Sequence, residues 1–554
     1  MSLGQRKKVA RTAYLIFTKK HGLHVQTDAT RFLEELLQDD PNIPETMEKI
    51  VKSYKKRYAD QQAIIVDKAS LQAVVTSLQT SAATAAVLTP FNREDQIQES
   101  LQDMTISERS EPVNVHDHFH VVEAFDMPKL QYDYHSKAFI KASQKPSILG
   151  SAIDKGDMYR DRFNLVKQRL LRNENFCPSS MHLMEQDAYL KITPIKALIG
   201  HDEERFLLFG MLTQLEEGKF FLEDEDANIE LNLSQCAYGP GLFTDNAFVL
   251  AEGVFGEDHV FHVNDIGFPP AERRDMSDTL FSHMDFMGLP RPLVELDLLK
   301  DEEEAHNEIS FVILSELWLD QPKVMSALYQ MFEGYANEKI PLAFILIGNF
   351  TSQAVTANGI ESRQYKDNFS AFADMVAEFP ALATHSYFVF VPGSRDPWGG
   401  NILPHPPIPN LFTSRVKQKI RKAIFTSNPC RIRYCTQDIV IYREDILNRM
   451  WRNVLLRPNI EEESDPAKHL IRTLLDQGHM CPLPLNIRPI YWAHDHALRL
   501  YPLPHTLVLA DQCDNYGMTY EGTHCINPGS FPNSDFVWSV YYPSTRTSER
   551  RQLS

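Results

Sequence analysis

Three apolar runs between Ile309 and Pro397 constrain the fold of this chain more than any other feature. The runs read ISFVIL, LAFILI and YFVFV, and each is followed by a polar turn: SELWLDQ, GNFTS and PGSRDPW. A continuous apolar run of about five residues is typical of a strand buried on both faces of a parallel sheet. Helix-period apolar residues fill the two intervals: Val324, Leu328 and Met331, then Phe369, Phe372, Met375, Val376 and Phe379. The stretch predicts a β-α-β-α-β unit, in which any chemistry belongs on the turns that follow the strands.

These three turns, taken in order, resemble those of calcineurin-like metallophosphoesterases. Active members carry Asp-x-His, Gly-Asp and Gly-Asn-His-Asp or -Glu, because two metal ions need carboxylate, amide and imidazole ligands. This chain has Glu316-x-Trp318, Gly348-Asn349 and Gly393-Ser394-Arg395-Asp396 instead. The indole of Trp318 cannot bind a cation, and the guanidinium of Arg395 would bring a positive charge into the place of one. The resemblance therefore implies the fold of these enzymes without their metal site.

Later segments continue the same resemblance. The next histidine of the fold is His479 in QGHMCPLP, and the closing Gly-His-x-His turn is replaced by Ala510-Asp511-Gln512-Cys513 after the run LVL. The turn INPGSF still resembles that fold. Nine residues are thereby implied to occupy positions of a lost metal site: Glu316, Trp318, Asn349, Ser394, Arg395, Asp396, His479, Asp511 and Cys513. We expect no catalytic residue, no metal and no other cofactor.

Longer stretches resemble one family of accessory proteins. They include GMLTQLEEGKFFLED, FVLAEGVF, FHVNDIGFPP, FVFVPGSRDP, NPCRIRYCTQDIVIYRED and CINPGSFPNSDF. They are similar to the non-catalytic B subunits of eukaryotic replicative DNA polymerases, and among these to the epsilon type, over roughly Val122 to Ser544. The resemblance implies a nuclear DNA-replication subunit that holds the C-terminal domain of the catalytic subunit. It also implies contact with the CMG helicase, including GINS, through the N-terminal domain. The small histone-fold subunits would be indirect partners, and DNA would be met only through the complex.

We expect a multidomain α+β chain with six segments. Residues 1–80 carry four helix-period apolar stripes, for which the resemblance implies a bundle like the lid of AAA+ ATPases. Residues 81–114 lose that period and have the composition of a linker. Residues 115–193 form a connecting segment that packs on the body, residues 194–270 an OB-fold, residues 271–307 an acidic connection, and residues 308–554 the inactive phosphoesterase-like α/β sandwich.

The OB-fold is predicted from five short strands between Arg205 and Ile266, which Gly, Asp and Asn turns separate. OB folds often bind single-stranded nucleic acid through a basic groove. This stretch holds 12 Asp and Glu but only Arg205 and Lys219, so we expect it to repel phosphate. Its aromatic residues are better assigned to core and protein contacts: Phe220, Phe221, Phe248, Phe255 and Phe261.

Several smaller clusters are open to more than one interpretation. His116, His118 and His120 would share one face of a strand, which allows metal binding but also suits a solvated edge. His494 and His496 resemble metal ligands but lack carboxylate partners, so we favour structural roles. Cys430 and Cys435 are the nearest cysteine pair and are assigned to the core. The prolines of NILPHPPIP favour extended backbone that a partner can reach.

Three classes of function compete on this basis. The first is a catalytically inactive scaffold subunit of a replicative polymerase, which we favour. The second is an active metal-dependent phosphodiesterase with unusual ligands, and the third is an OB-fold protein that binds single-stranded DNA. The net charge of -18 argues against the third class. No run of 18 apolar residues and no signal peptide is found, so we expect neither secretion nor a membrane role.

Overall fold

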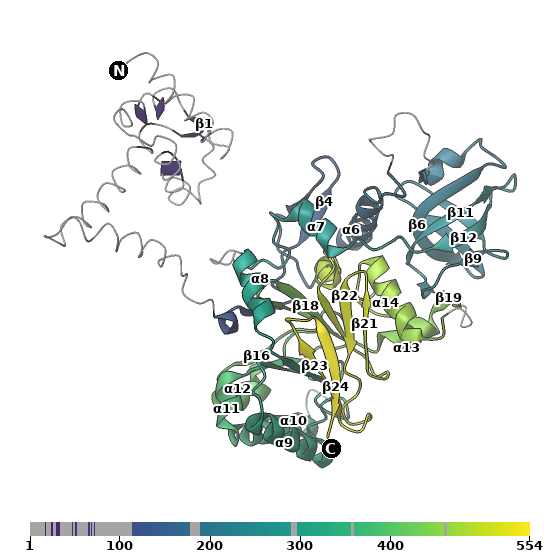
Figure 1. Ribbon diagram of the computed structural model, residues 1–554. Helices are drawn as coiled ribbons and strands as arrows, with labels where there is room; N and C mark the ends of the chain where they lie inside the picture. Colours follow the sequence, from purple (N-terminus) through teal and green to yellow (C-terminus); the bar gives the residue numbers. More distant parts are fainter. Residues whose placement is uncertain are drawn as a thin grey trace. The chain divides into compact units, whose positions relative to one another are not determined.

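The computed structural model describes residues 114–177, 189–289, 296–355, 359–458 and 463–553, together with scattered residues among the first 71. The chain divides into two compact units, Met1–Glu111 and Pro112–Ser554 (Figure 1). In the first unit, β1 (His24–Val25) and β2 (Ile65–Val66) pair in parallel, which the helical stripes do not predict. Each of the four stripes contributes a buried residue: Phe17, Leu33, Val51 and Leu71. Residues 81–113 of the predicted linker lie outside the described residues.

The predicted β-α-β-α-β unit is present. Strands β13 (Phe311–Ser315), β14 (Ala343–Ile347) and β15 (Tyr387–Val391) pair in parallel, and all their residues except Tyr387 are buried. The sheet continues with β16 (Ala423–Phe425) on one side and with β23 (Val537–Tyr542) and β24 (Thr547–Gln552) on the other. The helices that cover its outer face are α9 (Pro322–Asn337), α10 (Ile360–Ala377), α11 (Pro380–His385) and α12 (Asn410–Lys419).

A second six-stranded sheet packs on the inner face of the first. Its order is β21 (Tyr516–Tyr520), β22 (Thr523–Asn527), β20 (Thr506–Ala510), β18 (Gln437–Arg443), β17 (Cys430–Tyr434) and β3 (Phe119–Glu123). Phe311 and Ile345 of the first sheet share one buried cluster with Ile432 and Val508 of the second. Because the central strands of both sheets carry apolar residues toward this cluster, the two sheets form the predicted sandwich.

Helices α13 (Ile446–Arg452) and α14 (Pro466–Gln477) cover the outer face of the second sheet, over Val440, Tyr442 and Leu507 (Figure 1). Asp465 caps α14, since its side chain accepts a hydrogen bond from Ala467 N at 2.9 Å, and proline follows at the first helical position. The helix ends at Gly478, whose φ of 63° is the left-handed conformation expected of a C-terminal glycine.

The five predicted strands of the OB-fold are β6 (Arg205–Glu216), β7 (Lys219–Glu223), β8 (Asn228–Asn232), β11 (Phe248–Phe255) and β12 (Phe261–Gly267). Their pairings form a cycle, because β11 pairs with both β6 and β12, and β12 pairs in parallel with β8. Phe255 and Phe261 are buried in the core of the domain, on which Phe220 packs. Phe248 is buried in a separate cluster with Phe163 and Phe209. The short strand β9 (Ala237–Tyr238) pairs with β12 within the same sheet. The short strand β10 (Phe243–Thr244) joins the domain to the body by pairing with β19 (Val454–Leu456).

Helix α6 (Ala152–Leu170) connects the OB-fold to the body, and a reciprocal capping box between Ser151 and Asp154 begins it. Around it lie the hairpin β4 (Leu130–Asp133) and β5 (Ala138–Lys141), and the helix α7 (Arg274–Phe281). Within residues 114–553 as described, the remaining helices are α8 (Leu296–Ala305) and three 3₁₀ turns, η3 (Val115–Asp117), η4 (Ile195–Leu198) and η5 (Trp492–Leu498). Of the helices within the described ranges, none is long and apolar enough to cross a bilayer.

Two local expectations are wrong. His116 lies in η3 and His120 in β3, so the three histidines do not share one strand, and both of these side chains are exposed. The proline-rich run is packed on the body, because Leu403 bridges Ile490, His405 bridges Asn428, and both are buried. The prolines restrict this backbone, but its apolar side chains and carbonyls find partners within the chain.

Candidate functional site

The turn after β13 places Glu316 at the centre of the predicted site. Its side chain is fully buried, and its backbone has a φ of 63°. One carboxylate oxygen accepts a hydrogen bond from Trp318 Nε1 at 2.9 Å, and the other accepts one from Asn349 Nδ2 at 2.8 Å. That second oxygen also forms an ion pair with the guanidinium of Arg443, the last residue of β18. Both oxygens of the Glu316 carboxylate are therefore engaged by side chains of this chain.

Arg443 is the residue that joins the three strand ends of the site. Besides the pair with Glu316, its Nε donates to the carbonyl oxygen of Gly348 after β14 at 2.8 Å. Its Nη1 donates to the carbonyl of Ala510 in β20 at 3.0 Å and to Asp445 at 2.8 Å. Burial alone would raise the pKa of Glu316, but the Arg443 guanidinium outweighs it and holds that pKa below its usual value. An internal cation is thus bound among residues for which the resemblance implies a metal site.

Asp396, on the turn after β15, also accepts hydrogen bonds at both of its carboxylate oxygens. Its Oδ1 accepts hydrogen bonds from Phe350 N and from the Tyr365 hydroxyl, both at 2.9 Å, and its Oδ2 accepts one from Gly393 N at 2.7 Å. Burial raises the pKa of Asp396 to about 6 despite these donors. The carboxylate holds the turns after β14 and β15 together.

Arg395 makes its hydrogen bonds with the turn after β14. Its backbone N donates to Asn349 Oδ1 at 2.8 Å, and its Nη1 donates to the carbonyl of Ser352 at 2.8 Å. The cation that pairs with Glu316 is Arg443, although Arg395 also contributes to the lowered pKa of Glu316. Ser394 is exposed on the same turn. The former metal-site position that the resemblance implies for Arg395 stays a prediction.

The turn Ala510–Cys513 caps the N-terminus of helix α13. Asp511 Oδ2 accepts a hydrogen bond from Leu447 N in α13 at 2.9 Å, and Oδ1 accepts one from Gln512 N at 2.7 Å. Burial raises the pKa of Asp511 to about 6 and that of the Cys513 thiol to about 12. The Cys513 sulfur accepts from Asn527 Nδ2 at 3.1 Å. Asp511 lies next to the Glu316–Arg443 ion pair, because the carbonyl oxygen of the preceding residue, Ala510, accepts a hydrogen bond from Arg443.

His479 is engaged in a separate cluster. Its Nε2 lies 3.3 Å from Asp495 Oδ1, and its Nδ1 accepts from Cys481 N at 3.0 Å. The same Asp495 receives Nε of Arg162 from α6 at 3.0 Å. Burial and then Arg162 lower the pKa of His479, so the ring is neutral at physiological pH. This histidine helps to dock α6 on the body.

The residues present do not fit a two-metal centre. Such a centre needs carboxylate and imidazole lone pairs that face a shared space. Both oxygens of Glu316 and both oxygens of Asp396 already accept hydrogen bonds, and His479 binds a different aspartate. A search of the part of the chain that the structure describes finds no group of three or more His, Cys, Asp or Glu residues able to hold a metal ion. This donor set does not favour the phosphodiesterase alternative.

The residues around Arg443 indicate from the sequence that its charge is buried. The run IVIY ends in Arg443-Glu444-Asp445, so charged residues follow a buried strand directly. That strand pairs in parallel with β20, whose end carries the Ala510–Cys513 turn. A charge in such a place needs a buried partner. The residue pattern predicts the hairpin, but it does not assign the arginine to the site.

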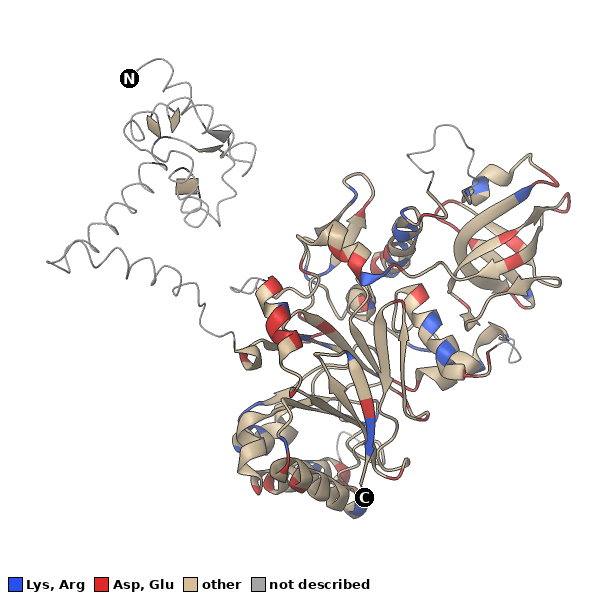
Figure 2. Ribbon diagram, in the orientation of Figure 1, with Lys and Arg blue, Asp and Glu red and all other residues tan. Residues whose placement is uncertain are grey.

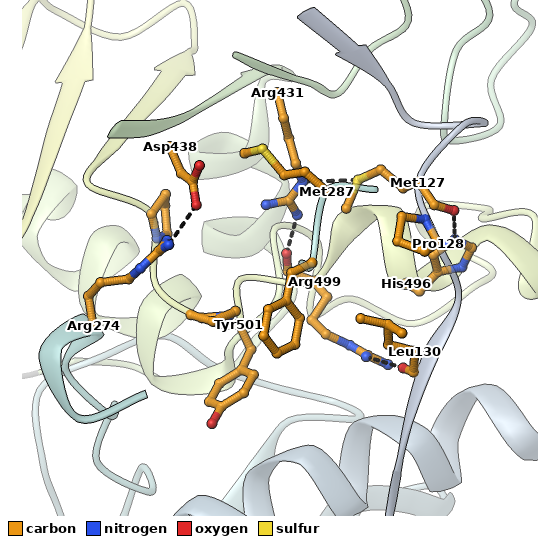
Figure 3. Close-up of a pocket in the computed structure, with 13 residues that line it drawn as sticks. Met127, Pro128, Leu130, Arg274, Met287, Arg431, Asp438, His496, Arg499 and Tyr501 are labelled. Carbon is orange, nitrogen blue, oxygen red and sulfur yellow. Dashed lines mark hydrogen bonds and ion pairs between the residues drawn. The ribbon is translucent and has the colours of Figure 1, made fainter. Parts of the chain in front are cut away.

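A small cavity at the other end of the second sheet shows how the connecting segments are held (Figure 3). Arg274 of α7 lies 2.7 Å from Asp438 Oδ2, and Arg499 donates to the carbonyl of Leu130 in β4 at 2.7 Å. His496 Nε2 lies 3.1 Å from the carbonyl of Met127. Burial and then Arg499 lower the pKa of His496 to about 4, so this histidine is neutral. The structural role expected of it agrees with these contacts.

The OB-fold domain keeps its acidic character in three dimensions (Figure 2). Its two cations between Arg205 and Ile266 are both paired: Arg205 lies 2.8 Å from Glu252, and Lys219 lies 3.2 Å from both Glu216 and Glu230. These strands, all of which the structure describes, build no basic groove. The geometry does not support the single-strand DNA-binding alternative.

Taken together, a two-sheet sandwich whose strand-end carboxylates are bonded within the chain, joined to an acidic OB-fold domain, defines a multidomain α/β protein. Comparisons with known proteins then give the family. Residues 311–518 match the family of DNA polymerase alpha/epsilon B subunits, and residues 152–270 match the DNA polymerase epsilon subunit 2-like OB-fold domain. The chain belongs to the family of DNA polymerase epsilon B subunits, which are accessory subunits with a role in DNA replication.

Individual relatives agree with this assignment. The chain is 37% identical to DNA polymerase epsilon subunit 2 of Mus musculus, over 97% of each chain. It is 38% identical to the DNA polymerase epsilon B subunit of Arabidopsis thaliana, over 78% of this chain and 82% of that one. It is 34% identical to the corresponding B subunit of Schizosaccharomyces pombe, over 96% of this chain and 93% of that one.

Proposed function

We propose that this chain works in the nucleus as a scaffold that holds the catalytic subunit of DNA polymerase epsilon, through the C-terminal domain of that subunit, and links it to the CMG helicase. The observation that supports the proposal is that the charged and polar side chains at the strand ends are bonded to one another and to backbone within the chain. At the ends of three strands, Glu316 is bonded to both Arg443 and Asn349, and Arg443 also donates to the carbonyl of Gly348. Strand ends bonded in this way stabilise a platform, because their carboxylates are engaged within the chain.

The second part of the proposal divides the work between the two compact units. The body from residue 115 onward would hold the catalytic subunit, while residues 1–80 would contact the helicase, including GINS. The separation of Met1–Glu111 from Pro112–Ser554 supports this division. A linker of about 34 residues spans roughly 30 to 35 Å as a random coil, which gives the tethered unit a high effective concentration near its partner. Weak helicase contacts would then suffice.

The remaining partners follow from the acidic body. A chain with a net charge of -18 and a paired, acidic OB-fold is expected to meet DNA only through the complex. The small histone-fold subunits would be held indirectly, through the catalytic subunit. We expect no contact with membranes.

The two units can be tested separately. Residues 1–85 and 112–554 would be expressed as independent proteins and mixed with the C-terminal domain of the catalytic subunit or with purified CMG helicase. We expect the larger piece to co-elute with the catalytic subunit and the smaller piece with the helicase. Failure of the larger piece to bind the catalytic subunit, or an unfolded circular dichroism spectrum for the smaller piece, would show that this division is wrong.

A further inference from the structure

A groove of about 510 Å³ runs across the OB-fold domain. Its floor is apolar: Leu231 is buried, and Phe220, Val260 and Leu456 are partly buried. Its rim carries Glu230 and Asp258 together with Lys219. A floor of this kind holds apolar or aliphatic parts of a ligand, and the rim selects its charge.

The place of this groove in the fold indicates an extended ligand. The turn between β6 and β7, the strands β7 and β8, and the turn between β11 and β12 all contribute to it. In OB folds this face and these two turns hold linear polymers such as oligonucleotides and oligosaccharides. The groove of this chain has the same position, so its shape suits a chain that lies along the strands.

The charge of the groove selects against the usual ligand. Lys219 lies 3.2 Å from Glu216 and from Glu230, so two carboxylates share its single charge. Glu217 and Glu257 lie exposed on the two turns, and Asp258 is exposed at the rim. Phosphate would meet a negative field here, whereas a positively charged polymer would be attracted.

We propose that this groove binds an extended, lysine- or arginine-rich peptide segment of a partner protein. Side chains of an extended peptide alternate between two faces. Apolar residues can therefore lie on Phe220 and Val260 while alternate cations reach Glu230 and Asp258. A long aliphatic stem also packs well on an apolar floor, since lysine and arginine bury their stems and keep the charge in water. The proposal stands apart from the division of labour given above.

The test uses the full-length protein and fluorescence anisotropy at physiological salt. The probe is a labelled 12-residue peptide of alternating lysine and valine, compared with a glutamate–valine peptide of equal length and with a 12-nucleotide oligo(dT). We expect the lysine peptide alone to bind with a dissociation constant below about 10⁻⁴ M, the range in which oligonucleotide binding without specific contacts begins. The double variant Glu230→Gln/Asp258→Asn should weaken binding about three- to tenfold, since each exposed ion pair contributes modestly.

Two further variants separate the groove from the overall charge of the protein. Asp226→Asn/Asp265→Asn removes the same number of charges from the same domain, outside the groove, and should change affinity less than about twofold. Lys219→Gln removes the cation of the rim and should tighten binding of the lysine peptide. Equal weakening by both double variants, loss of affinity in Lys219→Gln, absence of measurable binding of the lysine peptide, or tighter binding of oligo(dT) would each overturn the proposal.

Discussion

Arg443 and Glu316 form a buried ion pair whose two partners depend on each other. The side chains are 2% and 0% exposed, respectively. Removing a carboxylate and a guanidinium from water costs several kcal/mol each, and hydrogen bonds to Asn349, Trp318 and Gly348 help to offset that cost. Loss of one partner leaves the other charge without compensation. The ion pair therefore does more to fix which strand ends lie side by side than to increase the free energy of unfolding.

We expect Arg443→Met to lower the free energy of unfolding by about 3 to 5 kcal/mol, the usual cost of leaving a buried charge unpaired. The double variant Glu316→Gln/Arg443→Met should recover part of this loss, because no fully buried charge is left unpaired; Asp445, which also loses Arg443, is 32% exposed. Urea denaturation followed by tryptophan fluorescence measures both effects.

A surface pair provides the matched control for this comparison. Arg415 and Asp374 are 2.7 Å apart, but their side chains are 49% and 47% exposed. Arg415→Met should cost less than about 1 kcal/mol. Similar losses for Arg415→Met and Arg443→Met would mean that the interior pair has no special role.

His405 should give the stability of the protein a measurable pH dependence. It is 1% exposed, and burial followed by the nearby Arg488 lowers its pKa to about 4, against 6.5 in the unfolded chain. Below pH 6.5 the unfolded state therefore binds a proton that the folded state does not, and stability falls as the pH drops toward 4. This one group should contribute a loss of about 2 kcal/mol between pH 7 and pH 5.

The contribution is measured as a difference between proteins. Other buried groups titrate in the same range, including Asp396 with a pKa of about 6, which acts in the opposite sense. Urea unfolding of wild type and His405→Gln at pH 7 and pH 5 isolates the histidine, and the variant should lose less stability on acidification. His201→Gln, at an exposed position, should behave as wild type. An unchanged pH dependence in His405→Gln contradicts the assignment.

At the scale of elements, α14 fastens the OB-fold domain to the body through side chains that bond to backbone. Gln477 accepts from Phe248 N at 2.7 Å and donates to Phe248 O at 2.8 Å. Thr473 accepts from Leu242 N at 2.8 Å, and His469 accepts from Gly241 N at 3.0 Å. One helix face thereby satisfies four backbone groups of the neighbouring domain, and this fixes the two domains in register.

We expect Gln477→Leu to destabilise the protein by about 2 to 4 kcal/mol, because both backbone groups of the buried Phe248 lose a partner. Hydrogen exchange in β11 should increase with it. Gln552→Leu on the exposed end of β24 makes the same chemical change and should cost less than about 0.5 kcal/mol. Normal protection of β11 in Gln477→Leu would indicate that the clamp is unimportant.

The elements that the sequence predicts well are those with a local signal. The three apolar runs, the 430–445 hairpin and the end of α14 at Gly478 follow from period, β-branched content and a terminal glycine. The pairing of β3 with β17 and the docking of Arg162 on Asp495 join residues about 300 apart, so no local pattern reveals them. Arg443 belongs to the second kind, since its role depends on two strands that meet only in the folded protein.

At the scale of the whole molecule, the internal hydrogen bonds of Glu316 and Asp396 predict a protein that binds no metal ion at these residues and hydrolyses no phosphodiester. We expect purified full-length chain to contain no stoichiometric Mn, Fe or Zn by elemental analysis and to leave bis(p-nitrophenyl) phosphate intact with added Mn²⁺. The physical reason is that the carboxylate oxygens of Glu316 and Asp396 already have partners. About two metal ions per chain, together with hydrolysis that Asp511→Ala abolishes, would contradict this expectation.

Strand β3 has a consequence for the synthesis of the protein. It completes the second sheet by pairing Phe119–Glu123 with Cys430–Tyr434, and Ala124 N bonds Ser427 across 303 residues. A ribosome adds about 5 to 20 residues per second. The N-terminal edge of the sheet must then wait roughly 15 to 60 s for its partner strand, while the whole OB-fold domain emerges between them. Truncated products that end before β17 will expose β3 without its partner strand. We expect chaperones and proteases to bind such products.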